Sequence, residues 1–201
     1  MMITRRDFLK LAGSTVYLPF VPRNYPKKIM FVGDGVVRGD PFNQTTGPGF
    51  RNVLKAMIPE IAHIGSQSGN HESYTGMQTA DLIPLIDIAT TSYSPDIVFI
   101  HTGAFDVIQK APPAIAELVS VVKNNLPDAR IIVSKIIQFR SFNFLVAEYN
   151  TDVIAELDGV EVLHELEDLL LYKDYYDDYF PSYMGHFKIA TTISNYLRTK
   201  S

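Results

Sequence analysis

Short apolar runs alternate with amphipathic stretches along most of the chain. Five apolar runs, several of them rich in β-branched residues, predict strands at residues 29–32, 61–64, 97–100, 131–133 and 160–163. The run Ile97–Ile100 is the most β-branched and is bounded by a proline-containing turn and by Gly103. We therefore expect it to form the central strand.

The stretches between these runs show helical spacing of apolar residues. They predict helices at residues 50–57, 82–88, 115–126, 144–157 and 183–197. Five strands separated by helices predict an α/β fold, a flavodoxin-like three-layer α/β/α sandwich with a five-stranded, doubly wound parallel sheet. Ligands bind such sheets beyond the carboxyl ends of the strands. A site is therefore expected in the loops after Val32, Ile64 and Ile100 and before the last helix.

Composition narrows the class of protein. The chain has 201 residues, and 46% of them are hydrophobic. This length and composition are sufficient for one hydrophobic core, but the chain is too short for two typical domains. The net charge is −4 and both signs are mixed along the chain, so nucleic acid is not an expected partner. The sequence has no cysteine, which excludes disulfides, thiolate metal sites and a cysteine nucleophile.

The first 22 residues have the sequence features of a targeting segment and not of the folded domain. The stretch Thr4-Arg5-Arg6-Asp7-Phe8-Leu9-Lys10 resembles a twin-arginine export motif, and we expect a leader at 1–22, a domain at 23–201 and export from the cytoplasm. The apolar stretch that follows is too short, and is interrupted by Pro19, for a transmembrane span. No Ala-x-Ala cleavage signal follows, and an ordinary basic N-terminal helix remains the alternative.

Four short blocks lie where the predicted fold places a site. They are Gly33-Asp34-Gly35 after the first strand, the stretch from Gly65 to Gly76 after the second, Gly103-Ala104-Phe105-Asp106 after the third, and Asp177-Asp178-Tyr179-Phe180-Pro181 before the last helix. Their order and positions resemble the SGNH (GDSL-type) hydrolases, which include esterases and lipases. The resemblance covers residues 29–197.

The resemblance implies a serine nucleophile, two oxyanion donors and an Asp–His pair, and this chain departs from that set. Gly35 stands at the serine position, Phe105 at the oxyanion asparagine and Phe180 at the histidine. The positions of Asp34, Gly76, Asp106 and Asp177 match the family. Gly35 cannot attack an acyl carbon, Phe180 cannot accept a proton and Phe105 cannot stabilise an oxyanion. We therefore expect a degenerate catalytic site.

Other residues leave alternatives open. His186 could supply a relocated base, although it is expected to face away from the site, and His101 could enter the cleft or bond beneath it. The other histidines are expected in strands (His63, His164) or on a polar loop (His71, beside Glu72), and none has the spacing of a metal site. The matching aspartates could instead cap turns, accepting backbone N–H groups.

The aromatic and acidic run Tyr172–Tyr179 could be a solvated loop or the rim of a cleft floored by Phe105 and Phe180. Expected ligand contacts are Gly35, Gly76, His101, Phe105, Asp177 and Phe180. No metal or cofactor is expected.

Three functions follow from these residues. The first is a catalytically inactive binding protein for a glycan, an acylated small molecule or a cell-envelope component. The second is an active carbohydrate or lipid esterase with a rebuilt site. The third is a structural or assembly protein on a hydrolase scaffold, which a large stable oligomer would favour. The oligomeric state cannot be inferred from the sequence.

Overall fold

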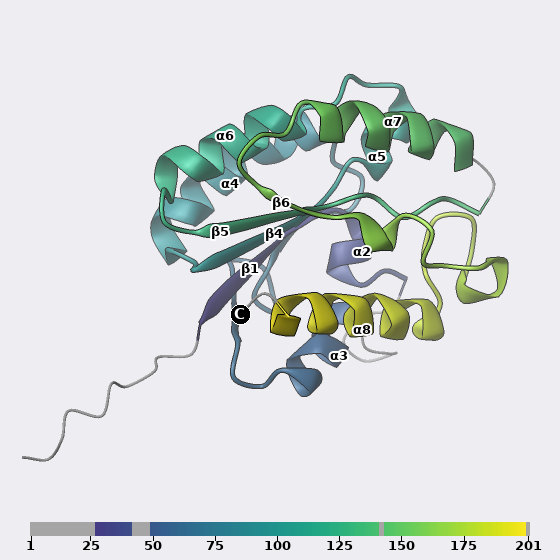
Figure 1. Ribbon diagram of the computed structural model, residues 1–201, viewed down its shortest axis with the longest axis horizontal. Helices are drawn as coiled ribbons and strands as arrows, with labels where there is room; N and C mark the ends of the chain where they lie inside the picture. The colour runs from purple at the N-terminus through teal and green to yellow at the C-terminus, as the bar shows by residue number, and fades with distance from the viewer. Residues whose placement is uncertain (1–26, 42–48, 141–142, 200–201) are drawn as a thin grey trace, which may run out of the picture.

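The computed structural model of the chain describes residues 27–41, 49–140 and 143–199. A twisted sheet lies between two layers of helices (Figure 1). One face is covered by α4 (Thr79–Tyr93), α6 (Ile115–Asn125) and α7 (Asn143–Ala155), the other by α3 (Phe50–Met57) and α8 (Tyr183–Thr199). This is the predicted three-layer α/β/α sandwich. The expected leader lies outside the described residues.

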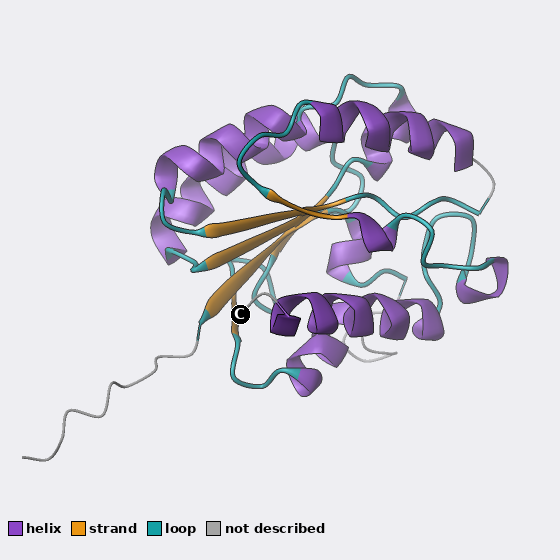
Figure 2. Ribbon diagram, in the orientation of Figure 1, coloured by secondary structure: helices purple, strands orange, loops and turns teal. Residues whose placement is uncertain are grey.

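The strands of the sheet are all parallel (Figure 2). They are β1 (Lys28–Gly33), β2 (Ala62–Ile64), β3 (Glu72–Ser73), β4 (Ile97–His101), β5 (Arg130–Ser134) and β6 (Glu161–Leu163). The order is β2-β1-β4-β5-β6, with β3 also paired to β1. The five predicted strands are confirmed. The sixth, β3, has two residues and is too short to give a periodic signal.

Short helices follow the two central strands and β6. They are α2 (Gly35–Arg38), α5 (Ala104–Gln109), and the 3-10 turns η1 (His164–Leu166) and η2 (Tyr172–Asp174). His164 was expected in a strand, but it begins η1 immediately after β6. His71 and Glu72 were expected on a polar loop, but both are buried because the chain returns here to pair with β1.

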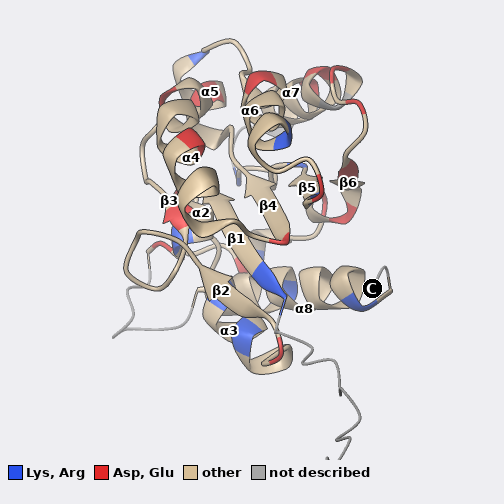
Figure 3. Cartoon of the chain, turned by 90° about the vertical axis from the view of Figure 1, so that its left-hand side faces the viewer, with Lys and Arg blue, Asp and Glu red and all other residues tan. Residues whose placement is uncertain are grey.

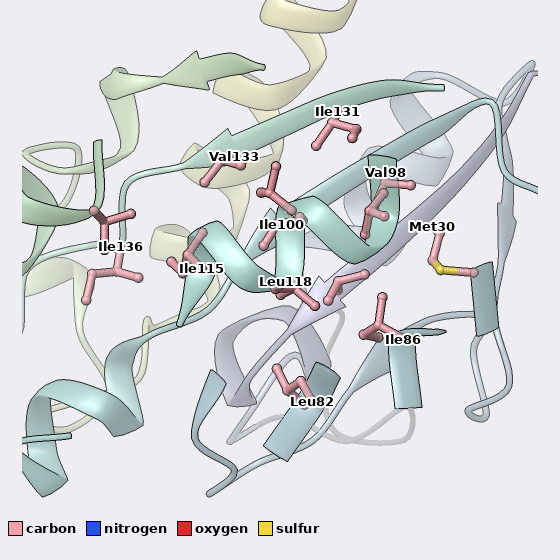
Figure 4. Close-up of a cluster of buried hydrophobic side chains, with 14 of the residues drawn as sticks. Met30, Leu82, Ile86, Val98, Ile100, Ile115, Leu118, Ile131, Val133 and Ile136 are labelled. Atoms are coloured by element: carbon pink, nitrogen blue, oxygen red, sulfur yellow. The ribbon is translucent and has the colours of Figure 1, made fainter. Parts of the chain in front are cut away.

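The two faces of the sheet carry separate cores. Figure 4 shows the face under α4, α6 and α7, where side chains such as Met30, Val98, Ile100, Leu82 and Leu118 pack together. The opposite core gathers Phe31, Phe50 and Phe99 with apolar residues of α8. Alternate residues of each central strand enter opposite cores, as the two-residue period of a strand requires.

Charged residues lie on the helices, the loops and several strands, including the first residues of β1 and β5, whereas β4 carries no Lys, Arg, Asp or Glu (Figure 3). β4 is buried along its whole length, as expected for a central strand covered on both faces. Within the described part of the chain, no helix is both long and apolar enough to cross a bilayer.

Candidate functional site

A pocket of about 300 Å³ lies at the carboxyl ends of β1 and β4. Its walls are almost entirely carbon. The lining residues are Asp34, Gly35, Val36, Thr75, Gly76, Ala104, Phe105, Ile108, Phe139, Tyr179 and Phe180. Loops from all four sequence blocks therefore converge on one cavity. Gly35, Gly76, Phe105 and Phe180, four of the six expected ligand contacts, lie together in its wall.

Phe180 occupies the space that a side chain at position 35 would need. A Cβ atom built on Gly35 would lie 2.6 Å from Cε1 and 3.2 Å from Cζ of the Phe180 ring. Contacts below 3.0 Å are not compatible with a normal Cβ. The absence of a side chain at position 35 and the aromatic ring at position 180 are thus sterically matched to each other.

Phe105 lies over the second glycine of the pocket. Gly76 has a φ of +83°, and a Cβ there would lie 4.0 Å from Cζ of Phe105, an ordinary van der Waals distance. Phe105 offers an aromatic edge where the family has an amide donor. Together the two phenylalanines make the pocket apolar at the positions where the resemblance implies polar catalytic groups.

Asp177 does not line the pocket but holds the loop that carries Phe180. Its Oδ1 accepts hydrogen bonds from the backbone N–H groups of Tyr179 and Phe180, both at 2.8 Å. A bridge between Tyr175 and Pro181 closes the same loop. Asp177 was expected to contact ligand; in the structure it instead caps a turn and fixes the position of the aromatic wall.

Part of the aromatic and acidic run borders the pocket. Tyr179 lines it and packs edge-on against Phe139, with ring centroids 5.6 Å apart. Tyr172 and Tyr176 are exposed, and the Arg140 guanidinium lies over the Tyr172 ring at 3.6 Å. The run is therefore partly a wall of the pocket and partly a solvated surface.

Asp34 is a buried carboxyl at the pocket, with one oxygen unpaired among the described residues. Its Oδ1 accepts the Val36 N–H at 3.1 Å and caps α2, whereas Oδ2 has no hydrogen-bond partner. Burial raises the pKa of Asp34 to about 7, and the nearby Asp106 adds to this effect, against backbone hydrogen bonds that lower the pKa. The neutral form of Asp34 therefore persists to a much higher pH than that of an exposed aspartate.

Asp106, by contrast, has a full set of donors. Its carboxylate accepts hydrogen bonds from the Thr79 N–H at 2.8 Å, the Thr79 hydroxyl at 2.6 Å and the Tyr149 hydroxyl at 2.7 Å. The preceding Gly103 has a φ of +116°, and a Cβ there would lie 2.4 Å from the Tyr149 oxygen. The glycine is thus required for the tyrosine to reach Asp106.

His101 was expected among the ligand contacts, but it lies beneath the pocket. Its Nδ1 is 2.7 Å from the Ser134 hydroxyl, and the side chain is buried at the junction of β4 and β5. Burial lowers the pKa of His101 to about 4, so the ring is neutral at pH 7. The structure places His101 in the packing between strands.

His186 also has a structural position. Its Nδ1 accepts the Phe50 N–H at 3.3 Å, so its Nε2 carries the proton and donates to the Asp40 carbonyl at 3.1 Å. The ring thereby ties α8 to α3 and to the segment after α2. Burial lowers the pKa of His186 to about 4. His186 is not among the residues that line the pocket.

One serine–histidine pair lies near Gly76. The Ser73 hydroxyl is 2.7 Å from Nδ1 of His71, which also accepts the Ser73 N–H at 3.2 Å. Both residues are at most 4% exposed and neither lines the pocket. An ester could not reach this hydroxyl, so the pair serves the packing of β3 against β1.

A polar group that the sequence blocks did not indicate lies at the edge of the pocket. Thr75 lines the pocket and donates its hydroxyl proton to Oδ2 of Asp40. Arg38 lies against the same two residues, with Nη1 3.4 Å from the Thr75 hydroxyl and Nε 3.9 Å from Asp40 Oδ1. Thr75 directly precedes Gly76 and lies within the second block. Arg38 and Asp40 lie outside all four blocks, so no sequence pattern groups them with Thr75.

Across the described residues, no group of three or more His, Asp or Glu side chains could hold a metal ion. The geometry provides an apolar pocket with a polar edge, and the described residues that line it include no serine or histidine. Such a cavity can bind an apolar group beside a polar one.

Solved structures with the same fold include esterases and an acylhydrolase. A family 3 carbohydrate esterase from Clostridium thermocellum superposes with a TM-score of 0.73 at 19% identity, covering 86% of this chain and 98% of the other. A family 3 carbohydrate esterase from Talaromyces cellulolyticus gives 0.65 at 21% identity, covering 86% and 97%. The lipase/acylhydrolase from Enterococcus faecalis gives 0.68 at 16% identity, covering 87% and 96%.

No protein-family model and no curated protein sequence matches the chain. The structural likeness therefore establishes the fold. It does not by itself establish an activity.

Proposed function

We propose that this chain, which has the SGNH hydrolase fold, binds an acylated polar molecule, such as an acylated glycan, without hydrolysing it. The observation that carries the proposal is the Phe180 ring packed against Gly35, which fills the space of the missing nucleophile. Loss of the nucleophile alone removes roughly six orders of magnitude in rate in a serine hydrolase, and loss of the base adds little.

The lining of the pocket supports an acyl or aryl group as the buried part of the ligand. Phe105, Ile108, Phe139 and Phe180 present carbon surface, and burying apolar surface contributes roughly 25 cal/mol per Å². The fold neighbours named above are esterases, which cleave molecules of this kind. This chain would bind ligands of the same class without cleaving them.

Binding without turnover is tested with ethyl hexanoate and the full chain. Saturable broadening of the ester's NMR signals, with the ester intact after a day, is the expected result. Ala104→Leu, which adds carbon atoms inside the pocket, should weaken binding about tenfold. Ala147→Leu, on the exposed face of α7, is the matched control and should leave binding unchanged. Absence of saturable binding, or equal effects of both variants, would refute the pocket as the site.

A second candidate function is slow ester hydrolysis with Thr75 as the nucleophile, because its hydroxyl donates to Asp40 beside Gly76. In that reaction the Thr75 oxygen would bond to the acyl carbon, Asp40 would take the proton, and the alcohol would leave with that proton. Water would then release the acid. A carboxylate is a weaker base than imidazole for a hydroxyl proton, which favours binding over turnover.

We also propose that the chain is exported, on the basis of the motif Thr4–Lys10. Export would bring the pocket to acylated envelope glycans. Replacing Arg5 and Arg6 with lysine should retain a fused reporter in the cytoplasm. Unchanged export of the reporter would refute the twin-arginine assignment.

A further inference from the structure

Arg38, Asp40 and Thr75 form one polar cluster, called the rim cluster below. The Thr75 hydroxyl donates to Asp40, and the Arg38 guanidinium contacts both residues, at 3.4 Å to the hydroxyl and 3.9 Å to the carboxylate. The three side chains come from the end of α2 and from the loop after β3. They are distant in sequence but adjacent in the fold.

The main chain holds Asp40 in place from both sides. Its N–H donates to the Gly35 carbonyl at 2.9 Å, and its carbonyl accepts from His186 Nε2 at 3.1 Å. The carboxylate is thus positioned before any ligand arrives. A fixed group loses little conformational entropy on binding.

A buried arginine fixes the rest of the loop. Arg51 donates to the carbonyls of Val37 at 2.6 Å, Arg38 at 3.2 Å and Gly69 at 2.9 Å. These bonds join the carboxyl end of α2 to the loop before β3. Burial lowers the pKa of Arg51 to about 10, so the guanidinium stays charged at neutral pH.

The rim cluster adjoins the pocket at the position of the missing nucleophile. A Cβ atom built on Gly35 would lie 2.9 Å from Oδ2 of Asp40, and Thr75 itself lines the pocket. A ligand with its acyl group against Phe180 therefore presents its ester oxygen and the adjoining part of the alcohol to these side chains.

The chemistry of the cluster selects the kind of alcohol. A carboxylate accepts hydrogen bonds, a guanidinium donates them and a hydroxyl does both. Neighbouring hydroxyl groups of a sugar can satisfy all three at once. The opposite charges of Arg38 and Asp40 oppose strong selection of either an anion or a cation.

We propose that the rim cluster is a polar subsite that binds neighbouring hydroxyl groups of a sugar whose acyl substituent fills the apolar pocket. This inference rests on the proposed function and names the residues that recognise the polar half of the ligand.

The test compares two hexanoate esters on the full chain by titration calorimetry. Glucose 6-hexanoate should bind about tenfold tighter than ethyl hexanoate, since two or three charge-assisted hydrogen bonds contribute on this scale. Asp40→Asn, Arg38→Gln and Thr75→Val should each remove most of this preference. For Asp40→Asn and Arg38→Gln, whose residues lie outside the pocket lining, affinity for ethyl hexanoate should change less than twofold.

A matched control removes a carboxylate at the opposite end of the strands from the pocket, before the amino end of β2. Glu60→Gln, in the exposed turn before β2, should leave both affinities unchanged. Circular dichroism confirms that each variant is folded, and the three rim variants provide independent readings should one fail to fold. Two further esters separate the two halves of the ligand: hexanoyl glycerol shows how much of the preference depends on the sugar ring, and glucose 6-acetate shows how much of the affinity depends on the acyl chain.

The outcomes separate the two proposals. Equal affinity for both hexanoates, or a preference that survives all the folded rim variants, would overturn the subsite and leave the apolar pocket standing. If neither ester binds, the proposed function itself is overturned. Tighter binding of the sugar ester, lost in the rim variants only, supports both.

Discussion

Two buried aspartates at neighbouring strand ends have very different surroundings. Asp106, after β4, accepts three hydrogen bonds from Thr79 and Tyr149. Asp34, after β1, lines the pocket and has one oxygen without a partner among the described residues. The Asp106 carboxyl is part of a complete hydrogen-bond network within the fold, whereas the Asp34 carboxyl borders the pocket.

The difference between the two carboxyls indicates which of them the fold needs for its own stability. A buried polar group without partners is costly, so the complete network of Asp106 contributes to stability. At the pocket, the buried Asp34 carboxyl has an incomplete set of hydrogen-bond partners among the described residues, and the Phe180 ring fills the space beside Gly35. The positions that depart from the family resemblance, Gly35, Phe105 and Phe180, all line the pocket.

Replacing Asp106 should have the largest effect on stability. Asp106→Ala leaves the Thr79 amide, the Thr79 hydroxyl and the Tyr149 hydroxyl without their acceptor, and should lower the free energy of unfolding by about 4 kcal/mol. Urea denaturation measures the loss. Asp152→Ala, exposed on α7, is the control. A loss below about 1 kcal/mol for Asp106→Ala would contradict the contrast between the two carboxyls.

Asp34 should make the free energy of unfolding depend on pH. Its pKa is raised from 3.8 to about 7 in the folded chain, so between these values the folded state holds a proton that the unfolded state has released. Its contribution to stability therefore falls as pH rises through this range. The amide of Asp34→Asn does not titrate, and the variant should gain about 2 kcal/mol relative to the native chain between pH 5 and pH 8.

Urea denaturation of both proteins at several pH values measures this difference, and subtraction cancels all other titrating groups. A difference that stays constant from pH 5 to pH 8 would show that Asp34 is ionised throughout. The pocket would then contain a charged carboxylate at neutral pH.

Gly35 and Phe180 should be coupled. Gly35→Ser alone places a Cβ 2.6 Å from the ring and should destabilise the chain by about 2 kcal/mol. With Phe180→Ala in the background, the same substitution should cost at least about 1 kcal/mol less. The matched cycle with Phe105→Ala should show no such coupling, because Phe105 packs over Gly76 instead. Equal coupling in both cycles would rule out the steric match.

The fold could be predicted from the sequence because its signals are local and strong. Within β1, β4 and β5, the runs Ile29–Val32, Ile97–Ile100 and Ile131–Val133 are continuously apolar, as is typical of buried parallel strands. The strand β3 gave no such signal, because its pairing with β1 depends on a loop that buries His71 and Glu72. Only the three-dimensional path of the chain makes these polar residues interior.

The site could be predicted in position but not in full. Gly35, Gly76, Phe105 and Phe180 were identified because each falls in a block at a strand end or before α8. The rim cluster was missed because Arg38 and Asp40 lie outside these blocks and reach Thr75 only through the turn after α2. The roles of His101 and Asp177 depend on partners that no spacing specifies.

The most direct test of the central claim is the hydrolysis of 4-nitrophenyl acetate by the full chain, beside the variant Gly35→Ser, Phe105→Asn, Phe180→His. We predict that the native chain releases nitrophenol at the rate of buffer alone. The triple variant should exceed that rate, because the family resemblance implies that the introduced serine and histidine would form a triad with Asp177 beside the oxyanion donors. Turnover by the native chain that disappears in Thr75→Val would contradict the account and establish a rebuilt hydrolase.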